Sequence, residues 1–278
     1  MKNSEEISAA LGYSIDFARE KLAGKQIAVL TGAGISTDSG IPDYRGEGRV
    51  ARHPMTFDTF MQSEQAQRRY WARSFVGWSR IAQATPNAGH FALAEFEASG
   101  LLSGIITQNV DGLHQAAGSK SVLDLHGRLN RVRCMSCSLV ISREELDRWL
   151  SELNPGLQKD DSVEFSPDGD AEIEATAQFR FPRCPACAGV LKPDVVFFGE
   201  SVAPKLVEQA FNLVDRASAL LVAGSSLSVN SGFRFAKHAH KQGKPLVIVN
   251  LGPTKADELA SVKLVGNTSA VLRRLLND

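Results

Sequence analysis

The chain lacks an excess of charge of either sign, and it lacks a long apolar run. Lysine plus arginine and aspartate plus glutamate number 31 each, so the formal net charge is zero. A balanced chain has no overall field that would attract nucleic acid or an anionic membrane surface. No apolar run approaches the roughly 20 residues that cross a bilayer. We therefore expect no direct nucleic-acid or membrane partner, and we expect charged substrates to be recognised locally.

Cysteine is also scarce, with four residues in 278. They form two pairs with the same spacing, Cys134-x-x-Cys137 and Cys184-x-x-Cys187. This pattern is typical of a zinc ribbon rather than a disulfide framework. Four thiolates complete a tetrahedral zinc shell and leave no open position, so the pattern predicts one structural ion.

The first residues, Met-Lys-Asn-Ser-Glu-Glu, show neither the charged-then-apolar pattern of a secretory signal nor the acid-poor pattern of a transit peptide. We therefore expect a cytoplasmic location. The sequence contains no internal repeats or low-complexity tracts.

Short apolar runs alternate with helical patterns along most of the chain. Apolar runs predict strands at 27–30, 104–107, 219–223 and 246–249, and apolar spacing predicts helices at 5–23, 88–99, 206–214, 233–240 and 269–276. This alternation predicts an α/β fold with a doubly wound parallel, Rossmann-like sheet. We expect a single domain over 1–278, with the Rossmann-like part in 1–55, 86–132 and 190–278, and a small module inserted in it. That module comprises a helical part, 56–85, and the zinc ribbon, 133–189.

The helical part is rich in aromatic residues between Thr56 and Gln83. Aromatic side chains at helical spacing are usually buried, so the favoured interpretation is the core of a small helical lobe. An apolar tunnel over an active site is the alternative.

A glycine-rich turn follows the first predicted strand. Gly32 and Gly34 permit a tight turn whose backbone N–H groups can bind a pyrophosphate. The dinucleotide fingerprint G-x-G-x-x-G would need a glycine where Thr37 stands, and no acid stands about 20 residues further on to hold a ribose. The turn therefore indicates a nucleotide site, but not a dehydrogenase.

Polar residues follow the strand at 104–107. In open α/β sheets ligands bind at the carboxyl ends of strands, so Gln108, Asn109 and Asp111 are candidates for ribose or amide contacts. Asn109 or Asp111 could instead cap the helical turn that follows. Both interpretations stay open at this point.

His126 ends a short apolar segment, 121–126, and precedes Gly127. A histidine at a strand end beside a chain reversal is placed as a general base would be. A capped or surface histidine is the alternative. Further along, Leu191 to Glu200 is bounded by Pro193 and Gly199, and this pattern predicts a short strand or exposed edge that could pair with an extended peptide.

Five features follow one another along the chain: the Gly-Ala-Gly-Ile-Ser turn leading to Pro-Asp-Tyr-Arg, the string Thr-Gln-Asn-Val-Asp-Gly-Leu-His, the isolated His-Gly, the two cysteine knuckles, and the later Gly-Ser-Ser and Val-Asn. In this order they resemble the motifs of the sirtuins. Sirtuins are NAD-dependent protein-lysine deacylases. The resemblance covers nearly the whole chain. Segments 69–78, 166–170 and 192–200 resemble most the class II branch, which includes a mitochondrial member, and the missing transit peptide suits a bacterial relative.

The resemblance implies that NAD is consumed, that acylated lysines of proteins are the partners, and that nicotinamide and O-acyl-ADP-ribose are released. It implies His126 as general base, with Asn109 beside it at the catalytic centre. It implies that NAD is held by Gly32, Ala33, Gly34, Ser36, Asp43, Tyr44, Arg45, Gln108, Asn109, Asp111, Gly224, Ser225, Ser226, Asn250, Leu251 and Thr268. It implies that the substrate peptide pairs with Val195, Val196, Phe197, Phe198, Gly199 and Glu200.

The acyl group is less sharply indicated. Tyr70 and Arg73 have a Tyr-x-x-Arg spacing that resembles the acidic-acyl recognition pair of class III sirtuins. A guanidinium can bind a carboxylate in bidentate fashion. The alternative is that both are ordinary helix residues, so acetyl, acidic, branched and lipoyl groups stay open.

Two other functions remain open from the sequence alone. One is protein mono-ADP-ribosylation at the same NAD site. The other is a non-enzymatic NAD-sensing or zinc-dependent interaction module, which would leave His126 and the polar strand ends without a task. The sequence leaves the oligomeric state open.

Overall fold

The structure is a computed structural model that describes residues 14–44, 54–157, 167–169 and 176–277. Arg45 and part of the 166–170 turn lie outside the described residues. Within them, no helix is both long and apolar enough to cross a bilayer.

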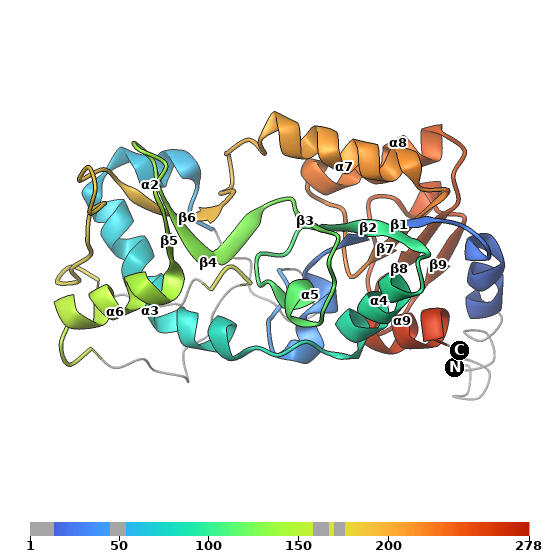
Figure 1. The fold of residues 1–278 in the computed structure, drawn as a ribbon, viewed down its shortest axis with the longest axis horizontal. Coiled ribbons are helices and arrows are strands. Elements are labelled where there is room, and N and C mark those ends of the chain that lie inside the picture. The colour runs from blue at the N-terminus through green and yellow to red at the C-terminus, as the bar shows by residue number, and fades with distance from the viewer. Residues whose placement is uncertain (1–13, 45–53, 158–166, 170–175, 278) are drawn as a thin grey trace.

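A six-stranded sheet forms the larger part of the molecule (Figure 1). All its neighbouring strands pair in parallel. Its order is β3 (Val122–Asp124), β2 (Leu102–Thr107), β1 (Ile27–Thr31), β7 (Ala219–Ala223), β8 (Leu246–Val249) and β9 (Val262–Leu264). The strand order reverses between β1 and β7, which is the topological switch point of a doubly wound sheet. The predicted fold class is confirmed.

Helices cover both faces of this sheet (Figure 1). Alternate residues of β1 face opposite cores. Ile27 and Val29 pack with α4 (Ala88–Ala98) and α9 (Thr268–Asn277), whereas Ala28 and Leu30 pack with α7 (Pro204–Arg216) and α8 (Asn230–Lys241). A helix at 14–22 joins the first of these cores. The helices and 3-10 turns of this part are η1 (Ala33–Ile35), η2 (Thr37–Ser39), α4 (Ala88–Ala98), α5 (Leu113–Ala116), α7 (Pro204–Arg216), α8 (Asn230–Lys241), η3 (Asp257–Leu259) and α9 (Thr268–Asn277).

The small module stands at one end of the molecule (Figure 1). It has a three-stranded antiparallel sheet in the order β5 (Val140–Ser142), β4 (Gly127–Cys134) and β6 (Leu191–Val195). Three helices pack on it, namely α2 (Phe57–Gln62), α3 (Glu64–Gln83) and α6 (Arg143–Leu153). Strand β6 and most of β4 lie in ranges that we expected for the Rossmann-like part, 190–278 and 86–132. They belong to the small module because they pair with each other on either side of the cysteine knuckles.

The aromatic residues of α2 and α3 form the core of this module. Phe60, Tyr70, Trp71, Phe75 and Trp78 are each less than 9% exposed. Their rings meet edge to face, as at Phe60 and Tyr70, where the ring centroids are 5.4 Å apart. The interpretation of these aromatics as a lobe core is confirmed.

Gly127 connects the two parts directly after His126. Its φ is +80°, and a Cβ there would lie 2.0 Å from the backbone oxygen of Asp194. Only glycine combines this left-handed backbone with so close an approach of two chains. The histidine therefore stands at the point where the chain leaves the main sheet and enters β4.

Candidate active site

The glycine-rich turn lies at the switch point of the main sheet. Gly34 N–H donates to the Gly224 oxygen at 2.8 Å, and Gly32 N–H donates to the Ala223 oxygen at 3.2 Å. A Cβ on Gly34 would lie 2.9 Å from the Gly224 Cα, and one on Gly32 would lie 2.8 Å from the Ser225 Cβ. The ends of β1 and β7 therefore touch through their backbones, and side chains are excluded between them.

Three polar side chains converge beside this turn. Ser36 is fully buried and donates to Asp111 Oδ2 at 2.7 Å. Asn109 Nδ2 donates to Ser36 Oγ at 3.1 Å and to the Gly32 oxygen at 3.2 Å. The turn after β1 and the segment after β2 are thus joined by a single hydrogen-bond network.

Asp111 also satisfies the first N–H of α5, because its Oδ1 accepts a hydrogen bond from the Leu113 N–H at 2.9 Å. The capping alternative thus describes one of its oxygens, while the other faces Ser36. Burial raises the pKa of this carboxyl, and the two hydrogen bonds oppose the rise. A desolvated carboxyl of this kind is suited to bind an uncharged amide.

Gln108 links the ends of β2 and β7. Its Oε1 accepts a hydrogen bond from Ser225 Oγ at 2.7 Å. Its side chain lies against α8, where a Cβ on Gly232 would be 2.6 Å from Gln108 Nε2. The predicted residues of three strand ends therefore meet in one place.

His126 is held at both ring nitrogens. Its Nδ1 lies 2.9 Å from the backbone oxygen of Gln108, and its Nε2 lies 2.9 Å from Ser231 Oγ. Because a carbonyl oxygen only accepts, Nδ1 carries the proton and Nε2 is the basic nitrogen, which accepts from the Ser231 hydroxyl. Burial lowers the pKa of His126, so the ring is neutral near pH 7.

Sequence reasoning missed Ser231. It lies in an Asn-Ser-Gly run at the start of α8, and nothing local in this run marks it. The available signal was positional, because Ser231 follows the small-residue end of β7 and strand ends converge at the switch point.

The remaining predicted NAD residues differ in how deeply they are buried. Asn250 is half-buried after β8, with its Nδ2 bonded to the Gly252 oxygen at 2.9 Å, while Thr268 is buried at the start of α9. Leu251 is 71% exposed. Tyr44 is exposed and its ring lies 6.3 Å from that of Phe198.

The segment after β6 reaches His126 directly. Val196 N–H donates to the backbone oxygen of His126 at 2.8 Å. Strand β6 ends at Val195, so the observed strand is shorter than the predicted segment from Leu191 to Glu200. Val195 and Phe197 are buried in the small-module core. Phe198 between them and Glu200 is exposed, so only part of the segment forms an exposed edge.

Glu200 fixes the shape of this segment. Its Oε2 accepts from the Phe197 N–H at 2.9 Å and from the buried Lys192 ammonium at 3.0 Å. Gly199, with φ +82°, makes the turn between them. The Phe198 oxygen accepts from the Phe57 N–H at 2.9 Å, so a peptide would have to pair with other backbone groups.

Tyr70 and Arg73 lie on α3. Tyr70 is 3% exposed, and its ring centroid is 5.2 Å from that of Phe197. Arg73 is half-buried. The tyrosine therefore does not face solvent; it packs against the segment that we expect to bind substrate.

The four cysteines lie together at the far end of β4. Their sulfur atoms are within 4.8 Å of one another, with 3.5 Å between Cys134 and Cys187 and 3.7 Å between Cys137 and Cys184. Zinc–sulfur bonds of about 2.3 Å in a tetrahedron put sulfurs about 3.8 Å apart, so the cluster fits zinc. The eight residues of β4, from Gly127 to Cys134, separate the cysteine cluster from His126 and span roughly 25 Å as extended strand, which places the metal site far from the histidine.

The glycine turn also fits a dinucleotide. Its backbone is open to close approach where a Cβ would intrude, and buried hydroxyl, amide and carboxyl groups stand beside it. A doubly wound sheet with such a site at its switch point, plus a four-cysteine module, defines a nucleotide-binding α/β protein with a structural metal.

Comparison with known proteins defines the family. The Sir2 family model matches residues 32–231. The chain is 50% identical over 261 residues to NAD-dependent protein deacetylase 1 of Mycobacterium avium (strain 104), covering 92% of this chain and 93% of that protein. It is 54% identical over 242 residues to NAD-dependent protein deacetylase 1 of Streptomyces coelicolor, covering 86% and 81%. The chain belongs to the Sir2 family.

Solved structures agree with this assignment. The structure described as "Sir2-p53 peptide-NAD+" has a TM-score of 0.75 and 33% identity, covering 94% of this chain and 95% of that one. The structure of Sir2Tm bound to a propionylated peptide has a TM-score of 0.75 and 32% identity, covering 94% and 96%. The predicted family is confirmed.

The metal assignment predicts a specific response to chelation. Removing zinc should leave four adjacent thiols without their shared ligand, so the small module should loosen while the main sheet stays folded. Limited proteolysis with mass mapping should then show new cleavage in 133–189, and added zinc should restore protection. Unchanged cleavage after complete metal loss, verified by elemental analysis, would contradict a structural role.

Proposed function

We infer that this chain is an NAD-dependent protein-lysine deacylase, which releases nicotinamide and O-acyl-ADP-ribose. Relatives at about 50% identity over most of the chain are NAD-dependent protein deacetylases by name. One structural neighbour contains NAD and a p53 peptide. The observation that carries the inference is the setting of His126, a neutral histidine with a defined basic nitrogen at the point where the strand ends and the 196–200 segment meet.

In this proposal, the glycine turn holds the cofactor. The backbone of Gly32, Ala33 and Gly34 approaches the pyrophosphate, aided by Ser36 and by the Gly224-Ser225-Ser226 turn on the facing strand. Asn250, Leu251 and Thr268 lie toward the adenosine, and Asp43, Tyr44 and Arg45 start the segment that covers the cofactor. Bound NAD supplies a ribose carbon that accepts the acyl oxygen as nicotinamide leaves.

The buried polar network orients the reacting end. Asp111 binds the nicotinamide carboxamide, for which its desolvated carboxyl is suited. Gln108 and Asn109 bind the adjacent ribose. Both are held in place, because Gln108 is hydrogen-bonded to Ser225 and Asn109 to the glycine turn. Groups that are held in advance lose little freedom when the ligand arrives.

His126 then acts as the general base. A ribose hydroxyl that takes the place of Ser231 Oγ would meet the bare Nε2, which accepts its proton. The Gln108 carbonyl stabilises the ring as it becomes charged, since its hydrogen bond to Nδ1 favours the protonated form. Residues 196–200 pair with the substrate backbone and bring the acyl-lysine to this centre.

We propose that Tyr70 and Arg73 tune the acyl group. Tyr70 touches Phe197 of the substrate segment, and Arg73 lies one turn further along α3. An acyl group with a terminal carboxylate could pair with the guanidinium. We also propose a class II assignment, supported by segments 69–78 and 192–200.

The role of His126 is tested by His126→Ala. Loss of a general base lowers the rate by about two or more orders of magnitude, so nicotinamide release from NAD and an acetylated peptide should fall by that amount while NAD still binds. In the unmodified protein kcat/KM should rise with pH through the pKa of His126 and stay level above it. Because burial lowers this pKa below the ordinary value of 6.5, the midpoint of the rise should lie below pH 6.5.

The matched control is His240→Ala. His240 is an exposed histidine on α8 that bonds to the Leu259 oxygen, so its loss should leave turnover within about twofold. Undiminished turnover in His126→Ala would falsify the role of His126.

The acyl proposal is tested on one peptide carrying acetyl, succinyl, glutaryl, branched or lipoyl lysine. Arg73→Met should selectively raise KM for succinyl and glutaryl peptides, by about tenfold, because it removes a charge-assisted contact. Arg69→Met, an exposed residue one turn away on α3, should change none of these values. An equal rise in KM for acidic and neutral acyl groups in Arg73→Met would show that Arg73 does not bind the acyl carboxylate.

A further inference from the structure

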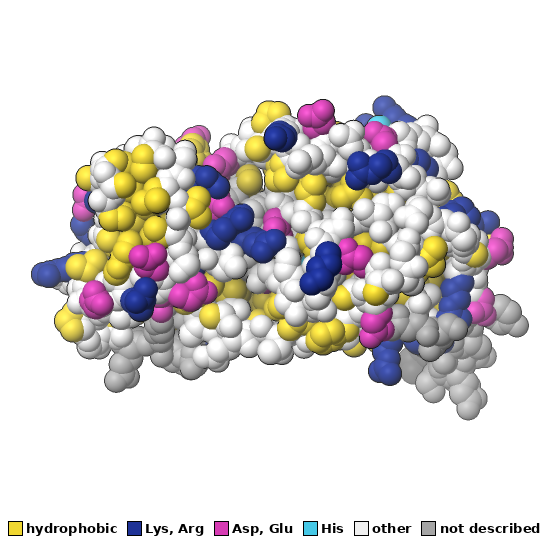
Figure 2. All heavy atoms as spheres, viewed as in Figure 1, with side chains coloured by type: hydrophobic (Ala, Val, Ile, Leu, Met, Phe, Trp, Pro, Cys, Tyr) yellow, Lys and Arg dark blue, Asp and Glu magenta, His cyan; other side chains and the backbone are white. Residues whose placement is uncertain are grey.

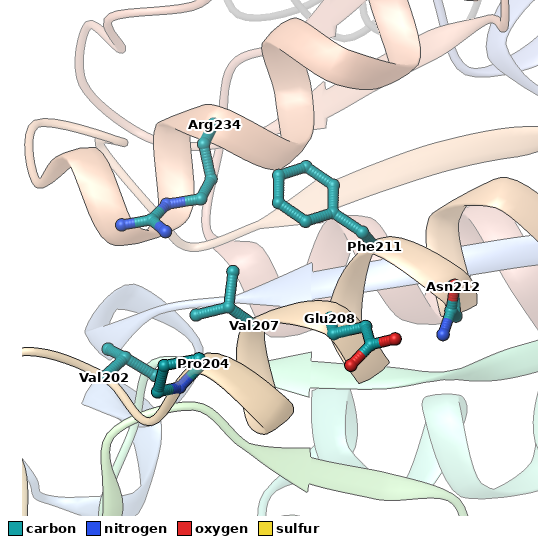
Figure 3. A pocket seen from close by; sticks show the side chains of 7 residues that line it. All are labelled: Val202, Pro204, Val207, Glu208, Phe211, Asn212 and Arg234. Carbon is teal, nitrogen blue, oxygen red and sulfur yellow. The ribbon is translucent and has the colours of Figure 1, made fainter.

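A groove of about 490 Å³ lies between α7 and α8. It is lined by Val202, Pro204, Val207, Glu208, Phe211, Asn212 and Arg234 (Figure 3). Figure 3 shows Arg234 reaching from α8 toward the end that holds Val202 and Pro204, while Glu208 and Asn212 lie toward the other end. The groove thus has an apolar floor, a guanidinium at one end and a carboxylate at the other.

Arg234 is available at this surface. Its side chain is exposed, and its hydrogen bond within the described chain runs from Nε to the Asn230 oxygen at 3.3 Å. Glu208 is exposed as well, and the ion pairs found among the described residues do not join it to Arg234. Both charges can therefore be used by a ligand.

Both walls of the groove belong to segments that also supply residues of the proposed active site. On α8, Ser231 contacts His126, and Arg234 follows three residues later on the same helix face. On the other wall, Val202 follows Glu200, the last residue of the substrate segment, by two positions. Burial lowers the pKa of His126, and the Arg234 charge lowers it further, so this guanidinium is close enough for its field to reach the catalytic centre.

We propose that this groove is a subsite for the residues that flank the acyl-lysine, and that it selects an apolar side chain followed by a carboxylate. The inference rests on the proposed deacylase function and names its substrate class. An extended peptide paired with residues 196–200 leads toward Val202. The apolar floor then buries a side chain, and Arg234 pairs with an acid. An extended chain advances about 3.3 Å per residue, so four residues on either side of the lysine cover about 13 Å in each direction.

The test uses acetyl-lysine peptides that differ at one position, with aspartate or lysine at each of four positions on either side. The readout is the ratio of kcat/KM for the aspartate and lysine versions. At the preferred position the ratio should be about five, expressed mainly in KM, and it should fall at high salt, as expected for an exposed ion pair. Arg234→Gln should bring the ratio near one, and Arg234→Glu should invert it.

A ratio is measured because Arg234 also acts on His126. A change in the base affects both peptides of a pair equally, so it cancels. Lys237→Glu is the matched control, since Lys237 is an exposed cation one turn further on α8 that does not line the groove. Its ratio should equal that of the unmodified protein.

Three results would overturn the subsite. A ratio of one at all eight positions with normal turnover would reject the groove and leave the deacylase function intact. If Lys237→Glu lowered the ratio as much as Arg234→Gln, the preference would come from the overall positive charge of this surface and not from Arg234. If Val207→Asp lowered the mass of the protein in solution and left the ratio unchanged, the groove would be a contact between two copies. Failure to deacylate any peptide would instead reject the function itself.

Discussion

The backbone contact between the ends of β1 and β7 is the constraint on which the site depends. Gly34 and Gly224 approach so closely that neither position has room for a side chain. The hydrogen bond from the Gly34 N–H to the Gly224 oxygen closes the switch point of the sheet. Asn109 donates to the Gly32 oxygen at 3.2 Å and Gln108 accepts from Ser225 at 2.7 Å, so both are anchored beside this contact. Ser36 is joined to them through the hydrogen bond from Asn109 at 3.1 Å. A shift of these strand ends would move every polar group that we assign to the cofactor.

A second glycine positions His126 beside the segment that we propose to bind the substrate. Gly127 lets the chain turn from the main sheet into β4 directly after His126, and it brings β4 against Asp194 of β6. The same histidine bonds through its backbone oxygen to Val196. The base, the proposed ribose contacts and the proposed peptide segment are therefore linked by direct contacts where the two parts meet. In Figure 2, arginine and lysine side chains gather on the surface between these parts. Across the small sheet, Arg131 and Arg133 of β4 both pair with Asp194 of β6.

Much of the fold follows from local patterns. Strands β7 and β8 have the predicted bounds, because each is a continuous apolar run that ends in small or polar residues. Strand β9 was not predicted, since it has three residues with Lys263 in the middle. Strand β4 was missed because its buried apolar residues Leu129 and Val132 are three positions apart, across an irregularity in register, and so do not show the period of two of a strand.

The functional site also has residues that could be predicted from the sequence and residues that could not. The glycine turn, the cysteine spacing and His126 are marked by residue type and by position in a motif, so they could be proposed from the sequence. The partner of His126 could not be, because Ser231 is 105 residues away and only the packing of α8 brings it there. Buried Arg143 is a similar case. Its pairing with Asp147 and its stacking over Trp78, at 4.9 Å, depend on the assembled core.

The central claim is that the acyl group of lysine moves onto ADP-ribose at this site. The most direct measurement is mass spectrometry of all products after incubation with NAD and a peptide carrying an isotopically labelled acetyl-lysine. The account predicts free lysine in the peptide, nicotinamide, and the label on ADP-ribose in equal amounts. ADP-ribose attached to the peptide or to the protein, with the labelled acetyl-lysine intact, would contradict it.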